Sequence, residues 1–267
     1  MAIRTVFSIV EDCSRGERQG WEDFARDYGA LTRTLLQHYF PTLSPDIETH
    51  VLAVFQRARA NQNEWFRQIK FSNEREFLMS FRELVFAYGR EVARVPVPQI
   101  SLEQMREIMK DLTLIERAML WMFIKGYSAQ QIAPMMMNAA ATAEATQKVA
   151  DERLTKVLPG SSPDAFNISV RVLMQEAEKT KSERCLALKT FNNIVNGQVS
   201  WRERELAEEH IKDCFNCLDR FTAFQEMIQL RKNTQRLQQN EVGAILVRLN
   251  LPAAKAKTVL GRIFSKV

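Results

Sequence analysis

The feature of this chain that most constrains its fold is the spacing of its apolar residues, which recur at steps of three and four. One such stripe comprises Trp21, Phe24, Tyr28, Leu31 and Leu35, as one face of an amphipathic helix requires. No stretch alternates apolar and polar residues for long enough to indicate a strand. The chain has only nine Gly and eight Pro among 267 residues, which argues against turn-rich β folds. We therefore expect an all-α protein.

Two proline-containing breaks divide the chain. VPVPQIS (95–101) and PGSSPD (159–164) cannot lie inside helices. We expect two helical domains, a linker, a third small helical domain and a basic C-terminal tail, at residues 1–95, 96–160, 161–184, 185–238 and 239–267 respectively. Residues 231–267 carry eight basic residues and one acidic residue, within a chain of net charge +5. This basic end either contacts nucleic-acid phosphates or forms the solvated face of packed helices.

Several function classes are disfavoured by what the sequence lacks. No apolar run approaches the length of a transmembrane span, and the first residues become charged too quickly for a signal peptide. No glycine-rich phosphate loop, Ser/His/Asp arrangement or pair of catalytic carboxylates stands out. We expect a cytoplasmic protein that is not an enzyme and has no membrane partner.

The second predicted domain has the pattern of a helix-turn-helix. An apolar helix within residues 114–124 is followed by Lys125-Gly126, which supplies a cationic last turn and a glycine stop. Ser128 then caps a second helix with Gln131 at the capping-box position, and a further helix is expected at about 141–157. A DNA-binding motif has this order and spacing, and a plain helical bundle is the alternative.

Four residues near the C-terminal end have the composition of a metal site: Cys185, His210, Cys214 and Cys217. The pattern H-x3-C-x2-C places three of them at spacings that one helical face can present together. Three sulfurs and one imidazole form a closed tetrahedral set that favours Zn²⁺ as a structural cofactor over magnesium or calcium. Free buried thiols beside a surface histidine are the alternative.

The first two domains resemble the extracytoplasmic-function sigma factors. The string ER-x-ML-x-x-FI-x-GYS-x-QQIA (116–133) is similar to region 4 of that family. W-x-x-F-x-x-x-Y (21–28), D-x-E-x-x-V-x-x-VF (46–55) and the aromatic-rich segment 77–88 are similar to region 2. Together these strings span about 140 residues in the family's order. The resemblance implies binding to the core of RNA polymerase and to promoter DNA.

The predicted recognition helix departs from the family at positions where basic residues are usual, which here are Glu144, Thr146, Val149 and Asp151. The residues that the resemblance assigns to DNA contact are Thr142, Thr146, Lys148, Arg153 and Lys156. Their weak positive charge predicts weak sequence-specific DNA binding through residues 141–157.

The segment from Cys185 to Cys217 resembles the zinc-binding anti-sigma domain, with Asn196-Gly197 at the family's turn and Ser200 at its helix start. The resemblance implies that this domain binds sigma regions 2 and 4 and keeps them from polymerase. We expect an intramolecular contact between the zinc domain and the sigma-like domains, and thus a transcription regulator inhibited in cis. The alternative is a degenerate sigma relative that acts only through protein contacts, as an anti-sigma factor or adaptor.

Overall fold

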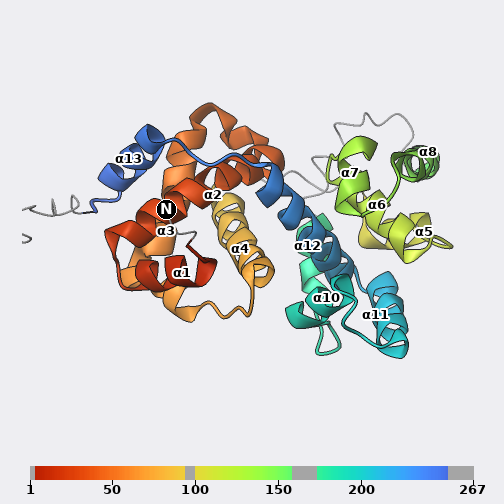
Figure 1. The fold of residues 1–267 in the computed structure, drawn as a ribbon. Coiled ribbons are helices and arrows are strands. Elements are labelled where there is room, and N and C mark those ends of the chain that lie inside the picture. Colours follow the sequence, from red (N-terminus) through yellow and green to blue (C-terminus); the bar gives the residue numbers. More distant parts are fainter. Residues whose placement is uncertain (1–3, 94–99, 158–172, 252–267) are drawn as a thin grey trace, which may run out of the picture. The chain divides into compact units, whose positions relative to one another are not determined.

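The computed structural model describes residues 4–93, 100–157 and 173–251, and these ranges consist of helices and connecting loops without a strand. The all-α prediction is confirmed (Figure 1). The helices are α1 (Val6–Ser14), α2 (Arg18–Tyr39), the 3₁₀ helix η1 (Pro41–Asp46), α3 (Ile47–Gln68), α4 (Glu74–Val92), α5 (Leu102–Ile108), α6 (Leu114–Ile124), α7 (Ala129–Met135), α8 (Ala140–Val157), α10 (Leu188–Val195), α11 (Trp201–Asp213), α12 (Phe215–Asn233) and α13 (Gln239–Arg248).

The chain forms two compact units whose limits cut across the predicted domains. Unit 1 comprises Met1–Thr34, Asp46–Ile69 and Gln235–Val267, and unit 2 comprises Leu35–Pro45 and Lys70–Thr234. The predicted linker 161–184 lies partly outside the described residues, and its described part includes a helical stretch at 173–179. No helix within the described ranges is both long enough and apolar enough to cross a membrane.

Unit 1 is built on an aromatic core from α2 and α3. Phe24 contacts the rings of Phe55 and Phe66 at centroid distances of 5.1 and 5.0 Å, and Trp21 contacts Phe66 edge-on. Such pairs stabilise a core beyond the area that they bury. The stripe predicted from residues 21–35 is thus the buried face of α2.

The C-terminal helix α13 belongs to unit 1. Arg33 on α2 donates to Glu48 and to Glu241 at the start of α13, at 2.6 and 3.0 Å. Leu246, Leu249 and Leu251 are buried. The described part of the basic C-terminal end therefore packs as a helix, while residues 252–267 of the predicted tail lie outside the described residues.

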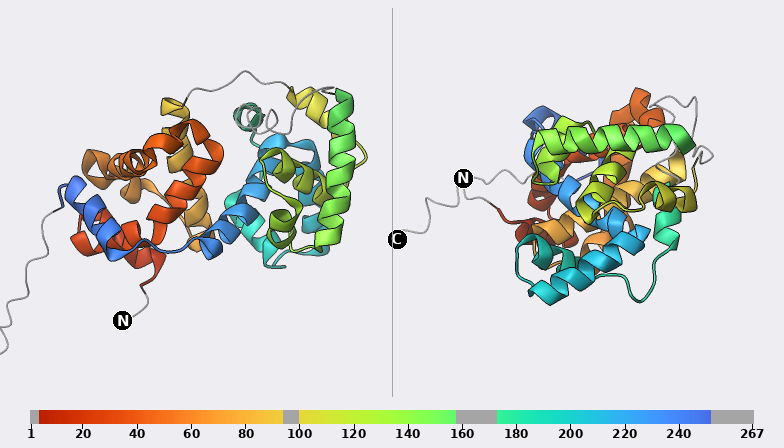
Figure 2. Two further views of the ribbon diagram at one scale, coloured as in Figure 1. Left: turned by 90° about the horizontal axis from the view of Figure 1, so that it is seen from above. Right: turned by 90° about the vertical axis from the view of Figure 1, so that its right-hand side faces the viewer.

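Within unit 2, the residues predicted as a helix-turn-helix domain contain the helices α5 to α8. Ser101 and Ser128 each cap a helix through a complete capping box, as predicted, and Thr113 does the same for α6. Gly126 has a φ of +88° after α6, a conformation that glycine adopts without steric cost. The long helix α8 packs against α6 and α7 (Figure 2).

Helix α12 is the central element of unit 2. Every residue from Phe215 to Met227 is buried except the half-buried Arg220. The helix packs against α4, α6, α7 and α11 (Figure 1). A helix that is buried around its whole circumference is a core element. Helix α12 therefore forms the common core against which α4, α6, α7 and α11 pack.

Candidate metal centre and the polar network of α12

The four predicted metal ligands lie together. One side-chain donor atom from each of Cys185, His210, Cys214 and Cys217 falls within 4.8 Å of every other one. The Sγ atoms of Cys185 and Cys214 are 3.7 Å apart, and His210 Nε2 is 3.2 Å from Cys217 Sγ. Ligand bonds near 2.3 Å place two sulfurs of a tetrahedral site about 3.8 Å apart. The spacing of this Cys/His cluster therefore suits a bound metal ion.

The prediction that one helical face presents three ligands is wrong. Helix α11 ends at Asp213, and Cys214 has extended backbone angles (φ −110°, ψ 106°) that place it between α11 and α12. His210 lies on the last turn of α11, while Cys217 lies on the first turn of α12. Cys185 lies in a turn before α10, closed by its N–H on the Ser182 carbonyl at 3.0 Å. The site thus clamps a helix junction to a preceding turn.

Hydrogen-bond donors surround the sulfurs. Cys185 Sγ accepts from the backbone N–H of Ser182 at 3.2 Å and from Asn216 Nδ2 at 3.3 Å. Cys217 Sγ accepts from the backbone N–H of Leu186 at 3.4 Å. Donors of this kind orient metal ligands and stabilise the negative charge of thiolates. The surroundings of the cluster therefore suit deprotonated, metal-binding cysteines.

The local environment gives the three thiols different pKa values. Burial raises the pKa of Cys185, but the hydrogen bonds from Ser182, Cys214 and Asn216 outweigh burial and lower the pKa to about 6. Burial, with the neighbouring sulfurs, raises the pKa of Cys217 to about 12, and burial also raises the pKa of Cys214. Cys185 is the thiol that its surroundings favour as a thiolate before metal binding, and a bound cation favours the thiolate form of all three.

A buried group of polar side chains surrounds α12 immediately after the ligands. We call it the α12 polar network, and its members are Tyr39, Arg82, Trp121, Lys125, Tyr127, Asp219, Thr222 and Glu226. The network connects α12 with the end of α2, with α4, and with α6 and the turn that follows it.

Asp219 is the first acidic centre of this network. Its carboxylate accepts from Trp121 Nε1 at 2.9 Å and pairs with Lys125 Nζ at 2.8 Å and with Arg82 at 3.5 Å. Burial raises the pKa of Asp219, but the two cations outweigh burial and lower it to about 2. Asp219 is therefore a charged, buried anchor between α12 and helices α4 and α6.

Glu226, two turns further along α12, is the second acidic centre and has no exposed surface. Tyr39 and Tyr127 both donate their hydroxyls to its Oε1 atom, and Lys125 Nζ lies 3.7 Å from Oε2. Burial, together with the carboxylate charge, raises the pKa of both tyrosines well above the usual value. The tyrosines are therefore neutral hydrogen-bond donors at physiological pH.

The sequence pattern alone did not predict this network. A signal for it was present, because Asp219 and Glu226 lie seven residues apart in a predicted helix that also carries three Phe and two Leu residues. That spacing puts both carboxylates on one face, where buried charges require partners. Lys125 was interpreted only as the cationic end of a helix.

The residues that the family resemblance assigned to DNA contact lie on α8 in two different situations. Thr142, Lys148 and Lys156 are exposed. Thr146 is buried and donates to the Thr142 carbonyl at 2.9 Å. Arg153 donates to the carbonyls of Ile108 and Lys110 at 2.7 and 2.8 Å, which fixes α8 to the end of α5. Two of the five candidates are thus engaged in packing.

No protein-family model matches this chain, and no curated protein or solved structure matches it either.

Proposed function

We propose that this chain is a cytoplasmic transcription regulator, a sigma-factor-like protein controlled in cis by a fused zinc anti-sigma segment. The observation that carries the proposal is the environment of α12. This helix starts at the metal-ligand cluster and packs against α4 on one side and against α6 and α7 on another. The family resemblance assigns α4 to region 2 and α6 and α7 to region 4, and it assigns the metal-bearing segment to their inhibitor.

The ion that we propose for the cluster is Zn²⁺. Three thiolates and one imidazole in a closed tetrahedral set are typical of structural zinc sites. The cluster contains no carboxylate, whereas magnesium and calcium prefer oxygen ligands. All four positions are supplied by the protein, so the ion would stabilise the junction of α11 and α12 without catalysing a reaction.

Covalent linkage would make such inhibition efficient. A tethered inhibitor meets its target at an effective concentration of about a millimolar for a short flexible connection. Release then requires a change that weakens the contacts of α12 rather than dilution or removal of a separate protein. The α12 polar network is the set of contacts on which such a change would act.

A degenerate sigma relative that acts only by protein contacts is the second candidate. It is favoured by the environment of α8, where Thr146 and Arg153 are engaged within the fold and only three candidate DNA contacts are exposed. Sequence-independent DNA affinity depends on cations that reach phosphates. In this alternative, polymerase binding persists without promoter recognition.

The test is capture of bacterial core RNA polymerase by the full-length protein. The released form is the double variant Tyr39→Phe/Tyr127→Phe, which removes both hydroxyl donors to Glu226. Tyr88→Phe on α4 is the matched control, outside the network. Inhibition in cis predicts that the double variant captures more polymerase than the wild type and the control. Absence of polymerase capture by all three proteins would reject both candidates, and capture without promoter-directed transcription would favour the second.

A further inference from the structure

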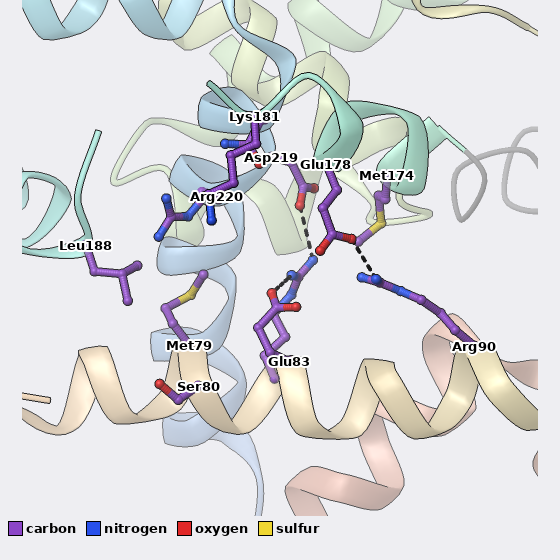
Figure 3. Close-up of a pocket in the computed structure, with 12 residues that line it drawn as sticks. Met79, Ser80, Glu83, Arg90, Met174, Glu178, Lys181, Leu188, Asp219 and Arg220 are labelled. Carbon is purple, nitrogen blue, oxygen red and sulfur yellow. Dashed lines mark hydrogen bonds and ion pairs between the residues drawn. The ribbon is translucent and has the colours of Figure 1, made fainter. Parts of the chain in front are cut away.

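A cavity of about 230 Å³ in unit 2 lies where α4 faces α12 and the helical stretch 173–179 (Figure 3). Its charged walls come from three parts of the chain. Helix α4 supplies Arg82, Glu83 and Arg90; the segment at 173–181 supplies Glu178 and Lys181; and α12 supplies Asp219 and Arg220. The cavity borders the metal-ligand cluster at Asn216, whose side-chain amide donates to Cys185 Sγ at 3.3 Å, but it contains none of the four ligands.

The three carboxylates of the cavity are already matched by cations. Glu178 pairs with Arg90 at 2.6 Å, as Figure 3 shows, and Glu83 pairs with Arg82 at 3.3 Å. Asp219 pairs most closely with Lys125 at 2.8 Å, behind the cavity wall. No carboxylate of this cavity is therefore left to attract a cationic ligand.

The cations of the cavity are in excess. Among the described residues, neither Lys181 nor Arg220 forms an ion pair. Arg220 donates one N–H to the Leu186 carbonyl at 3.0 Å, which uses only part of its donor capacity. Two positive charges at the walls thus have no neutralising partner within the described structure.

Arg82 adds an independent observation. Its side chain is 2% exposed, and its Nε–H has no hydrogen-bond partner although it is fully buried. Buried donors without a partner are rare and costly. The guanidinium is held in place by stacking on Phe86, at 4.1 Å from the ring centroid, so Arg82 is kept at the cavity wall.

We propose that this cavity binds a small oxyanion, a ligand that carries a phosphate or carboxylate group. Arginine forks match the planar arrangement of such oxygens, and lysine supplies a further positive charge. The volume admits inorganic phosphate or a short dicarboxylate and is below the usual range of sites for drug-sized molecules. Arg82, Lys181 and Arg220 are the recognition residues.

The ligand would join three elements, because the recognition residues come from α4, from the segment before α10 and from α12. Binding would therefore stabilise the contact between α4 and α12. Under the proposed function, on which this regulatory step rests, the oxyanion favours the inhibited form. Binding itself is independent of that function.

The binding test is calorimetric titration of the zinc-loaded full-length protein with inorganic phosphate and, separately, with succinate. We expect saturable binding of one ligand per chain. Lys181→Gln and Arg220→Gln should each weaken it about 10-fold or more, the effect of losing one charge-assisted hydrogen bond. Lys179→Gln is the matched control, because Lys179 is an exposed lysine two residues from Lys181 that pairs with Glu176 outside the cavity.

Binding of phosphate alone, of succinate alone or of both supports an oxyanion site and identifies the ligand group. No saturable binding of either probe would overturn the proposal. Equal binding by the wild type and by both cavity variants would overturn it too, because the affinity would then come from general surface charge. As a second readout, ligand should slow hydrogen exchange of α12 amides in the wild type and not in Arg220→Gln. A negative titration leaves the polymerase-capture result untouched, so the two proposals fail separately.

Discussion

Removal of the two hydroxyls that donate to Glu226 should destabilise the packing of α12. The size of the loss follows from the hydrogen bonds that are removed. Tyr39 and Tyr127 donate to the same carboxylate oxygen, and within the described residues the other oxygen pairs with Lys125 at 3.7 Å. A hydrogen bond to a buried charged group contributes about 1.5–3 kcal/mol. Each single Tyr→Phe variant should therefore lose about that amount. The double variant leaves a buried carboxylate without a hydroxyl donor and should lose about 3–5 kcal/mol.

Native-state hydrogen exchange of the amides of α12 measures this loss where it occurs. Each 1.4 kcal/mol corresponds to about a tenfold change in opening equilibrium. Each single variant should exchange about 10- to 100-fold faster in α12 than the wild type, and the double variant faster still. Tyr88→Phe should leave α12 exchange within about twofold, since its hydroxyl lies outside the network.

A third variant distinguishes the cost of a buried carboxylate without donors from a general packing defect caused by the two Tyr→Phe substitutions. In the Tyr39→Phe/Tyr127→Phe background, Glu226→Met replaces the carboxylate with an apolar side chain of similar volume. Lys125 retains Asp219 at 2.8 Å as its partner. The triple variant should recover most of the protection, because well-packed apolar groups can replace a buried polar cluster with little cost. Exchange as fast in the triple variant as in the double variant would refute the reasoning.

Three further outcomes are expected. Cys214→Ser should lose the metal and unfold the α11–α12 junction, because ligand binding supplies folding free energy in small metal sites; elemental analysis should give about one zinc per chain for the wild type and for the control Cys13→Ala. Gly89→Ala should destabilise unit 2 by about 1–3 kcal/mol in urea titrations, because the added Cβ would lie 2.3 Å from the Phe40 ring. The control Gly243→Ala on α13 adds a Cβ that has no neighbour within 4 Å among the described residues outside its own helix and should be neutral or stabilising. Arg153→Ala should lower the melting temperature by releasing two carbonyls at the end of α5, and an unchanged melting temperature would indicate that this arginine is free for DNA.

The parts that the sequence predicted are those determined by local pattern. Helix starts at Ser101 and Ser128 follow from side-chain caps three residues before a Gln, and both form complete capping boxes. The family resemblance gave the helix start at Ser200, which forms a complete capping box as well. The metal-ligand set was predicted from residue type and spacing, and the four donor atoms do lie together. Its helical placement was not predicted correctly, because the extended backbone of Cys214 interrupts the periodicity on which a one-face argument depends.

The parts that the sequence did not predict depend on contacts between distant segments. Tyr39 and Glu226 are 187 positions apart, and Arg82 and Asp219 are 137 positions apart. Local periodicity assigns each of these residues to a helix but carries no information about its partner. The assignment of α13 to unit 1 is of the same kind, since it rests on pairs such as Arg33 with Glu241. Such partners become visible only when the helices are packed.

The metal-ligand cluster and the α12 polar network lie on one helix, and we therefore expect metal binding and the network to be energetically coupled. Cys214 lies between α11 and α12, Cys217 lies on the first turn of α12, and Asp219 follows two residues later. A bound ion fixes the direction in which α12 leaves the junction, which sets the positions of Asp219 and Glu226 relative to their partners on the neighbouring helices. Loss of the ion would therefore weaken hydrogen bonds to Glu226 more than two turns away, although that residue contacts no metal ligand.

By the reciprocity of linked equilibria, variants that weaken the network should also lower the apparent metal affinity. The free energy of this decrease should equal the free energy by which loss of the ion weakens the network. Zinc affinity measured by competition with a chelator should thus decrease in the order wild type, single Tyr→Phe variants and double variant. Equal affinities would mean that the metal site and the network lie on the same helix without energetic coupling.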